Sequence, residues 1–298
     1  MFIGIDIGSI STKIVVINDM DNIIFTEYLL NRGNPIEAVT NIIKKTRGIN
    51  LHKYLSLCTT GSGRKYIGNL LQTDIIKNEI TTTWKAAVTI LPEVKTIIDI
   101  GGQDSKLITI ENGDISNFKL NSLCAAGTGA FIEQQANRLG IPMGKLSEIA
   151  LQTDKKAKFT GRCTVFVETE MINLQQTGYP VEAIAAGLID AVCENILNDL
   201  TPGIRIIKPI IFCGGVSQIK AIRQVLAKRI GIKIVLPDYN KTMAAYGAAL
   251  LAKEIFYNKK KDRIYNELSI NNNKMYMNRP AYCNNSDCLN CGLCYKKK

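Results

Sequence analysis

Two short turns of the chain carry a carboxylate, glycine and small polar groups at matching positions. The first is Asp6-Ile7-Gly8-Ser9, with Ser11, Thr12 and Lys13 directly after it, and the second is Asp99-Ile100-Gly101-Gly102, about 93 residues later. Backbone N–H and hydroxyl groups can donate to phosphate oxygens, an ammonium group balances their charge, and carboxylates hold Mg²⁺ through water. One such turn is most simply a hairpin, but two copies indicate a site for a polyphosphate with Mg²⁺.

A glycine pair follows a third apolar segment, in Cys213-Gly214-Gly215-Val216-Ser217. Because glycine lacks a Cβ, a glycine pair at a strand-to-helix corner lets a flat base or ribose lie against the backbone. Together with the two turns, this pair favours a nucleotide as the ligand.

Two cysteines stand where the apolar spacing predicts helices to begin. Cys124 precedes Ala125-Ala126-Gly127-Thr128-Gly129 and one helix, and Cys163 precedes another. The N–H groups at a helix N-terminus stabilise a thiolate or an anionic cluster. Two thiolates do not close a four-ligand site, but two copies in a twofold dimer do. The spacing alone leaves two readings open, a 4Fe-4S cluster shared between two chains or two inert buried cysteines.

Four further cysteines lie at the C-terminal end, with the spacing C-x4-C-x2-C-x2-C. They are Cys283, Cys288, Cys291 and Cys294. With only one histidine in the chain, a second iron–sulfur cluster or a four-cysteine Zn²⁺ site is the predicted use, and unused thiols are the alternative. The remaining Cys58, Cys193 and Cys213 lie in apolar segments, where we expect buried, inert thiols.

The elements that must position these groups alternate between strand and helix, which predicts an α/β fold. Strands are expected at 2–6, 13–18, 23–29, 55–59, 96–100, 105–111, 209–213 and 233–236, with a hairpin at Asn112-Gly113. Helices are expected at 35–46, 63–71, after each of the two cysteines, and at 181–200, 219–229 and 242–257. Repetition of strand, Asp-x-Gly turn and strand indicates a duplicated unit with a cleft between its copies.

Composition removes several classes of protein. The chain has 298 residues, 46% of them hydrophobic, which excludes overall disorder. No apolar run approaches the roughly 20 residues of a membrane span, and no signal peptide is recognisable, so a cytoplasmic protein with no membrane partner is expected. The net charge of +11 is concentrated in the segment 258–298, and no helix carries a basic stripe, so nucleic acid is not the expected partner.

The two Asp-x-Gly turns and Gly214-Gly215-Val216 resemble the phosphate and adenosine motifs of the ATPase superfamily of actin, sugar kinases and seventy-kilodalton heat-shock chaperones. This resemblance implies two ribonuclease-H-like domains with an ATP cleft between them. The first would be 1–95, completed by the helix 241–257, and the second would be 96–240, carrying the cluster ligands. A basic linker and cysteine-rich metal-binding tail would occupy 258–298.

The segments Asn121–Gly129 and Cys163–Glu168 narrow the resemblance further. They are similar to the two cluster-ligand motifs of the activators of 2-hydroxyacyl-CoA dehydratases and of the ATPase subunits of benzoyl-CoA reductase, over about Met1 to Lys253. The family resemblance implies an anaerobic homodimer with one 4Fe-4S cluster held by Cys124 and Cys163 of each chain. ATP hydrolysis would change the angle between the cluster-bearing helices. An electron from ferredoxin or flavodoxin would then pass to a partner iron–sulfur dehydratase or reductase.

The resemblance also assigns roles to residues of the cleft. Asp6, Asp99 and Gln103 would be catalytic, the two aspartates positioning Mg²⁺ and water. The residues expected to bind ATP are Gly8, Ser9, Ser11, Thr12, Lys13, Gly101, Gly102, Gly127, Thr128, Gly129, Gly214, Gly215, Val216 and Ser217.

Three alternatives to a dehydratase activator stay open. The chain could be the electron-activating subunit of a benzoyl-CoA-type or other double-cluster reductase, a small-molecule kinase, or an ATP-regulated scaffold. The last two leave Cys124 and Cys163 without a role. The tail cysteines lie beyond the resemblance, and a cluster there could feed electrons to the shared one.

Overall fold

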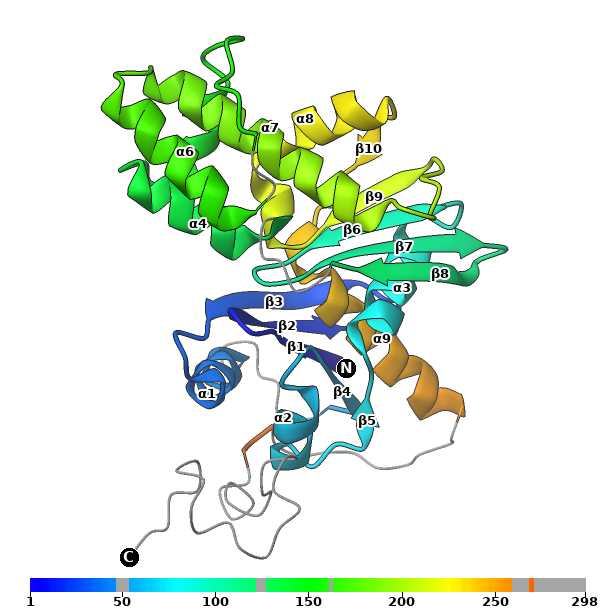
Figure 1. Cartoon of the computed structure of the whole chain (residues 1–298). Helices are drawn as coiled ribbons and strands as arrows, with labels where there is room; N and C mark the ends of the chain where they lie inside the picture. Colours follow the sequence, from blue (N-terminus) through cyan, green and yellow to red (C-terminus); the bar gives the residue numbers. More distant parts are fainter. Residues whose placement is uncertain (47–53, 122–126, 161–162, 259–267, 271–298) are drawn as a thin grey trace, which may run out of the picture.

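The computed structural model describes residues 1–46, 54–121, 127–160, 163–258 and 268–270, which contain two five-stranded sheets (Figure 1). The first sheet has the order β3-β2-β1-β4-β5, with β1 (Phe2–Ile7), β2 (Ser11–Ile17), β3 (Ile23–Leu30), β4 (Ser56–Thr60) and β5 (Ile75–Ile76). The second has the order β10-β9-β6-β7-β8, with β6 (Thr96–Ile100), β7 (Ser105–Glu111), β8 (Asp114–Leu120), β9 (Ile210–Cys213) and β10 (Ile234–Val235).

The two sheets have the same topology, which confirms the duplication predicted from the turns. Each begins with an antiparallel meander of three strands and continues on the other side of its first strand with two parallel strands. The register is equivalent as well, because Asp6 pairs with Lys13 across β1 and β2 as Asp99 pairs with Lys106 across β6 and β7. Each copy therefore places one aspartate and one lysine side by side at a strand end.

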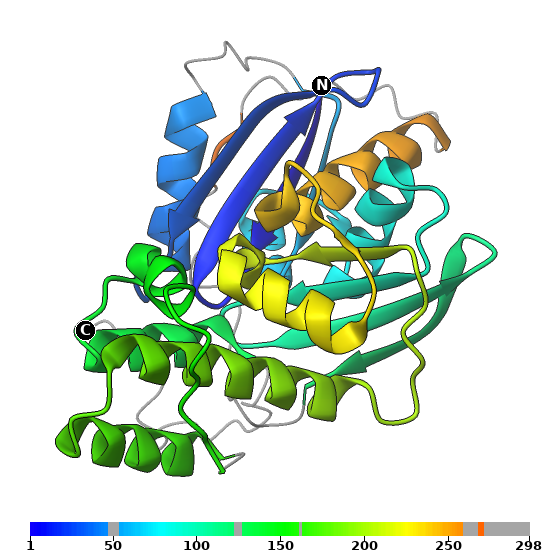
Figure 2. The same ribbon diagram turned by 90° about the horizontal axis from the view of Figure 1, so that it is seen from above.

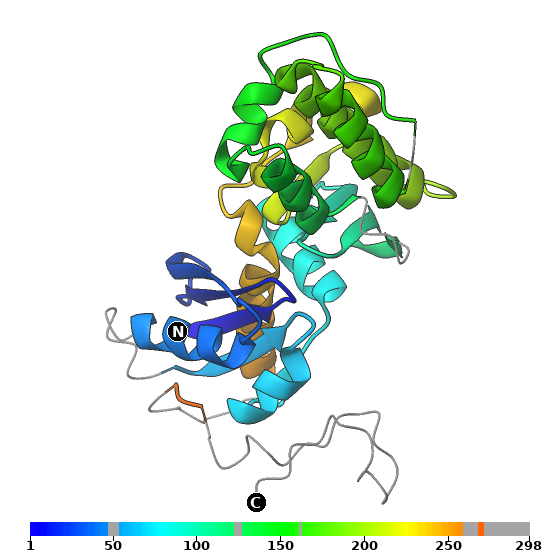
Figure 3. The ribbon, with the colours of Figure 1, turned by 60° about the vertical axis from the view of Figure 1, so that its left-hand side comes forward.

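Two helices lie between the sheets, α3 (Glu79–Ile90) and α9 (Met243–Asn258) (Figures 1 and 3). One hydrophobic cluster joins Phe2 and Val15 of the first sheet to Ile97 and Ile211 of the second through residues of both helices. The helices approach closely, since a Cβ added at Gly247 of α9 would overlap the backbone carbonyl of Thr82 in α3.

The remaining helices cover the outer faces of the sheets. On the first sheet these are α1 (Pro35–Thr46) and α2 (Arg64–Leu70). With the second sheet are α4 (Gly129–Arg138), α5 (Met143–Ala150), α6 (Thr164–Gln176), α7 (Val181–Leu200) and α8 (Lys220–Ile230). Two short 3₁₀ helices, η3 (Gly215–Gln218) and η4 (Asn240–Thr242), border the cleft. Figure 2 shows α6 and α7 running side by side. None of the described helices is both long and apolar enough to cross a bilayer.

The predicted elements are found among the described residues, together with the two 3₁₀ helices and other elements that were not predicted. The bounds of α1, α7, β6 and β7 agree with the expected ranges, and Asn112 and Gly113 turn the β7–β8 hairpin with φ values of 53° and 86°. The sequence patterns did not indicate α3, α5 or β5. Cys124 lies outside the described residues, and α4 begins at Gly129.

Residues 268–270, which lie within the predicted basic linker, contact the body of the protein. Leu268 is buried in the cluster that α1 and α2 form with the first sheet, and Ile270 packs against it. The chain after α9 therefore returns to the outer face of the first sheet. The four tail cysteines lie outside the described residues.

Candidate functional site

A cleft of about 250 Å³ lies where the two Asp-x-Gly turns meet. The predicted residues that line it are Asp6, Gly8, Ser9, Ser11, Lys13, Asp99, Gly101, Gly102, Gly129, Gly214, Gly215 and Val216. The two turns touch, since a Cβ on Gly102 would collide with the side chain of Ile10. The structure thus brings both turns and the glycine pair to one cavity.

Five of the predicted residues do not line the cleft. Gln103 has an exposed side chain, and Gly127 packs against Ile196 instead. Thr12, Thr128 and Ser217 are fully buried.

Two of these buried hydroxyls have partners away from the cavity. Because side chains alternate along β2, Ser11 and Lys13 face the cleft, whereas Thr12 donates to Asn31 Oδ1 at 2.7 Å. The Ser217 hydroxyl donates to Gly214 O at 2.6 Å and lies 2.9 Å from Asn240 Oδ1. The Ser217 hydroxyl therefore stabilises the backbone at Gly214 and does not face the cleft.

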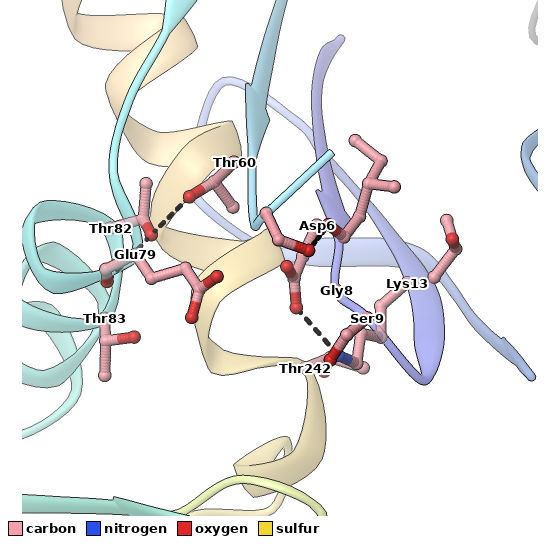
Figure 4. A network of polar contacts seen from close by, with 12 residues as sticks. Asp6, Gly8, Ser9, Lys13, Thr60, Glu79, Thr82, Thr83 and Thr242 are labelled. Carbon is pink, nitrogen blue, oxygen red and sulfur yellow. Dashed lines mark hydrogen bonds and ion pairs between the residues drawn. The ribbon is translucent and has the colours of Figure 1, made fainter. Parts of the chain in front are cut away.

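Asp6 and Lys13 form the charged pair of the first turn (Figure 4). The Lys13 ammonium donates to Asp6 Oδ2 at 2.9 Å. Burial lowers the pKa of Lys13, but Asp6, Tyr28 and Asp99 together raise it more, so its pKa lies above the ordinary lysine value. Asp6 Oδ1 is buried and has no hydrogen-bond partner among the described residues. A buried carboxylate oxygen without a partner is costly, so this oxygen is suited to a cation or an ordered water.

Lys106 is the centre of a second, larger charge cluster. Its ammonium lies 2.6 Å from Glu79, 2.9 Å from Asp104 and 3.8 Å from Asp99, and its side chain is 5% exposed. Burial raises the pKa of Asp99 and of Glu79, while Lys106 lowers both. Asp99 also accepts from the hydroxyl of Thr83 at 3.5 Å, so groups from two elements, β7 and α3, contact this carboxylate.

Glu79, Asp104 and Lys106 line the cleft but were missed from the sequence. A signal existed for Lys106, because a lysine follows the aspartate by seven residues in both turns, as Lys13 follows Asp6. Glu79 carries no local signal. It reaches the cleft because α3 begins there, capped by Asn78, whose side chain accepts from Thr81 N at 2.8 Å.

The opposite wall of the cleft is open and largely uncharged. Gly214 has a φ of 85°, and a Cβ added at Gly215 would meet no atom within 4 Å. At the rim, the ring of Tyr28 lies 5.7 Å from the Lys13 ammonium and 5.6 Å from the Lys241 ammonium. This wall has room for a flat ring beside the glycine pair.

The described cysteines differ sharply in environment. Cys163 is the N-cap residue of α6 and is exposed, next to the exposed apolar side chains of Val165 and Phe166. Cys58, Cys193 and Cys213 are buried, as predicted, and burial raises the pKa of the Cys58 thiol to about 12. Within the described ranges, no group of three or more His, Cys, Asp or Glu side chains is arranged to hold a metal ion.

Known proteins are similar to this chain over most of its length. The model of the BadF/BadG/BcrA/BcrD ATPase family matches residues 3–252. The (R)-2-hydroxyglutaryl-CoA dehydratase activating ATPase of Acidaminococcus fermentans is 30% identical over 253 residues, which cover 84% of this chain and 96% of that protein. An uncharacterized protein of Methanocaldococcus jannaschii is 32% identical over 87% of this chain, which spans 64% of that protein's length.

Solved structures extend the comparison to the fold. The activator of the 2-hydroxyisocaproyl-CoA dehydratase from Clostridium difficile with bound ADPNP has a TM-score of 0.79 at 29% identity, covering 88% of this chain and 98% of that one. A ROK family glucokinase from Streptomyces griseus has a TM-score of 0.52 at 13% identity, covering 85% and 99%, which is a likeness of fold alone. These neighbours confirm the predicted class, a two-sheet α/β fold of the actin and sugar-kinase type.

Proposed function

This chain belongs to the BadF/BadG/BcrA/BcrD ATPase family, and from that membership we propose that it is a cytoplasmic ATP-dependent reductive activator. In this proposal a homodimer holds one 4Fe-4S cluster. ATP hydrolysis is coupled to the transfer of a low-potential electron to a partner iron–sulfur enzyme. The electron donor is ferredoxin or flavodoxin, and the partner is a 2-hydroxyacyl-CoA dehydratase or, alternatively, a benzoyl-CoA-type reductase.

The observation that carries the ATP half of the proposal is the pair of equivalent turns on one cleft. Asp6 Oδ1, buried and without a hydrogen-bond partner among the described residues, fits a Mg²⁺ ion or its water. Ser9 and Ser11 line the cleft beside the glycines of both turns, and Lys13 brings a cation next to them. This donor set fits the phosphates of ATP with Mg²⁺.

Different residues of the cleft would bind Mg²⁺, bind phosphate and accept the proton during hydrolysis. Asp6 and Asp99 would hold Mg²⁺ and its waters, and Lys13 would neutralise a phosphate oxygen. Glu79 is the carboxylate best suited to take the proton of the attacking water, because burial raises its pKa and it lines the cleft. ADP and phosphate then leave. The two domains would move around the cleft, the first formed by residues 1–95 and 241–257 and the second by residues 96–240.

The electron-transfer half rests on the position of Cys163. An exposed thiol at the N-cap of α6 fits a cluster ligand, because helix N–H groups stabilise the thiolate and the anionic cluster. Val165 and Phe166, 64% and 63% exposed, offer an apolar surface for a second copy of the chain beside it. When bound, the cluster supplies one-electron storage, with Cys124 and Cys163 of both copies as ligands.

The four tail cysteines are proposed to hold a separate metal, an iron–sulfur cluster or Zn²⁺. A small-molecule kinase of the same fold would use the cleft but would give Cys163 no role. The phosphorylation of an added sugar or acid by the purified protein would support that second function.

Anaerobic purification with iron analysis and electron paramagnetic resonance tests the proposal. The experiment uses a full-length variant that lacks the tail site, so that any iron bound belongs to the shared cluster. In this variant Cys283, Cys288, Cys291 and Cys294 are changed to Ala. We expect a dimer with about two iron atoms per chain, half of one cluster. Adding Cys163→Ser should remove the iron and the signal while ADPNP binding is kept. A colourless, iron-free dimer with intact ATPase activity would overturn the redox half.

A further inference from the structure

Ser105, the first residue of β7, holds both ends of the segment 122–126. Its backbone N–H donates to Asn121 Oδ1 at 3.0 Å, and its carbonyl accepts from Asn121 N at 2.8 Å. Its hydroxyl donates to the carbonyl of Gly127 at 2.7 Å. Ser105 is 1% exposed, so these bonds are shielded from water. One buried residue therefore ties the chain on either side of Cys124.

The turn just before Ser105 is bonded to the start of α4. Gly129 N donates to Gly101 O at 3.0 Å, and Ala130 N donates to Gly102 O at 2.8 Å. The N–H groups of a first helical turn have no partner within the helix, so these bonds satisfy two of them. A Cβ on Gly129 would lie 3.1 Å from Gly101 O, which leaves little slack. The second Asp-x-Gly turn, at Gly101 and Gly102, and the start of α4 thus form one hydrogen-bonded unit.

The helix that begins with Cys163 is attached to the same unit. Glu168 of α6 accepts from Arg138 of α4 at 2.5 Å and from Gln134 at 3.4 Å. One carboxylate of α6 thus contacts two side chains of α4.

We propose that Ser105 is the positioning residue that couples the turn at Gly101 and Gly102 to the N-terminus of α4. A terminal phosphate bound by this turn sets the position of the turn's carbonyls. Those carbonyls and the Ser105 hydroxyl then set the position of the N-terminus of α4. Ser105 does not line the cleft, so it acts through its neighbours and not on the nucleotide. This inference rests on the ATP half of the proposed function.

The test compares Ser105→Ala with a matched control at the other end of the same sheet. Thr96 is fully buried, and its hydroxyl donates to Ile207 O at 2.8 Å and accepts from Ile207 N at 3.0 Å. Thr96→Val therefore also removes a buried hydroxyl that is bonded to a carbonyl. Hydrogen exchange of residues 127–138 is measured on the full chain with Mg²⁺, with and without ADPNP. ADPNP affinity is measured in parallel.

Wild type and Thr96→Val should show an ADPNP-dependent change in exchange over α4. Ser105→Ala should bind ADPNP within about twofold of wild type while this change shrinks by at least about fivefold, the low end of typical site-to-site coupling. Asn121→Ala, which removes the tie on the other side of Cys124, should reduce it as well and serves if Ser105→Ala folds poorly.

Two outcomes separate failure of the coupling from failure of the proposed function. A Ser105→Ala protein with the full ADPNP-dependent change would overturn the inference, because Ser105 would then have only a structural role. Wild-type protein that binds ADPNP without any change at α4 would overturn it too and leave the ATPase proposal standing. Wild-type protein that binds no ADPNP would overturn both.

Discussion

Replacing Lys106 by methionine removes the cation around which the largest charge cluster of the cleft is built. Methionine keeps an unbranched apolar stem of similar length, so packing changes little. The Lys106 ammonium lies 2.6 Å from Glu79 and 3.8 Å from Asp99, and its side chain is 5% exposed. Breaking a buried ion pair by removing one partner costs about 3–5 kcal/mol, because a buried charge is left uncompensated. We therefore expect Lys106→Met to lower the free energy of unfolding by about that amount at pH 8.

The pH dependence of this loss has a defined sign. Burial raises the pKa of Glu79 and of Asp99, and Lys106 is the largest influence lowering both, so its removal raises both pKa values further. The native variant then holds protons that the unfolded chain, with carboxyl pKa values of about 4, has released. Its stability therefore falls as pH rises between the unfolded and the raised folded pKa, by up to about 1.4 kcal/mol per pH unit for each carboxyl. The deficit relative to wild type should be smaller at pH 5 than at pH 8.

Urea unfolding at a series of pH values measures the effect. The single tryptophan, Trp84, is a suitable probe because its indole N–H on α3 donates to Gly113 O of the β7–β8 hairpin at 2.9 Å. Lys145→Met is the control, since Lys145 pairs with Glu148 on the exposed face of α5 and should leave the midpoint nearly unchanged. A Lys106→Met protein as stable as wild type at pH 8, or equally destabilised at pH 5 and pH 8, would refute the reasoning.

Three further predictions concern the cleft and the cysteines. Glu79→Gln should lower the kcat of ATP hydrolysis by about 10²–10⁴-fold with little change in KM, and an unchanged kcat would show that Glu79 is not the base. Because burial raises the pKa of Glu79, the wild-type rate should fall at acid pH with a midpoint above the ordinary glutamate pKa. Gly215→Val should raise the Kd for ADPNP at least about tenfold by filling the open space beside the glycine pair, whereas Gly144→Val on α5, where an added Cβ also meets no atom within 4 Å, should not, because Gly144 does not line the cleft. Equal effects of the two changes would show that ADPNP does not bind beside Gly215. In metal-free native protein at pH 8, iodoacetamide should modify Cys163 and leave Cys58, Cys193 and Cys213 intact, since burial raises the pKa of these three thiols. Mass spectrometry identifies the modified residues, and an adduct on Cys58 in the folded protein would contradict the prediction.

Local patterns sufficed where the chain dictates its own conformation. The helix Pro35–Thr46 and the strand Thr96–Ile100 follow from apolar spacing bounded by proline, glycine and polar residues, and the two turns follow from their repeated Asp-x-Gly. Gly140 and Gly178 follow the ends of α4 and α6 with φ values of 69° and 73°, the left-handed conformation that glycine adopts after a helix.

What the sequence did not reveal depends on tertiary contacts. The helix Glu79–Ile90 has three consecutive threonines in its second turn, a poor local signal, and it is stabilised by packing on α9 between the sheets. Glu79 consequently had no pattern to mark it. Thr12 and Ser217 carried the right chemistry for phosphate, but strand alternation and the packing of the glycine corner turn their hydroxyls away from the cleft.

The central claim, that nucleotide in the cleft acts on a shared cluster, is tested most directly by one spectroscopic titration. The full chain lacking the four tail cysteines is purified anaerobically and reduced with dithionite, and its electron paramagnetic resonance spectrum is recorded before and after ADPNP with Mg²⁺. We predict an iron–sulfur signal that requires Cys163 and changes when ADPNP binds. A protein that binds ADPNP but gives no such signal, or a signal that ADPNP leaves unchanged, would contradict the claim.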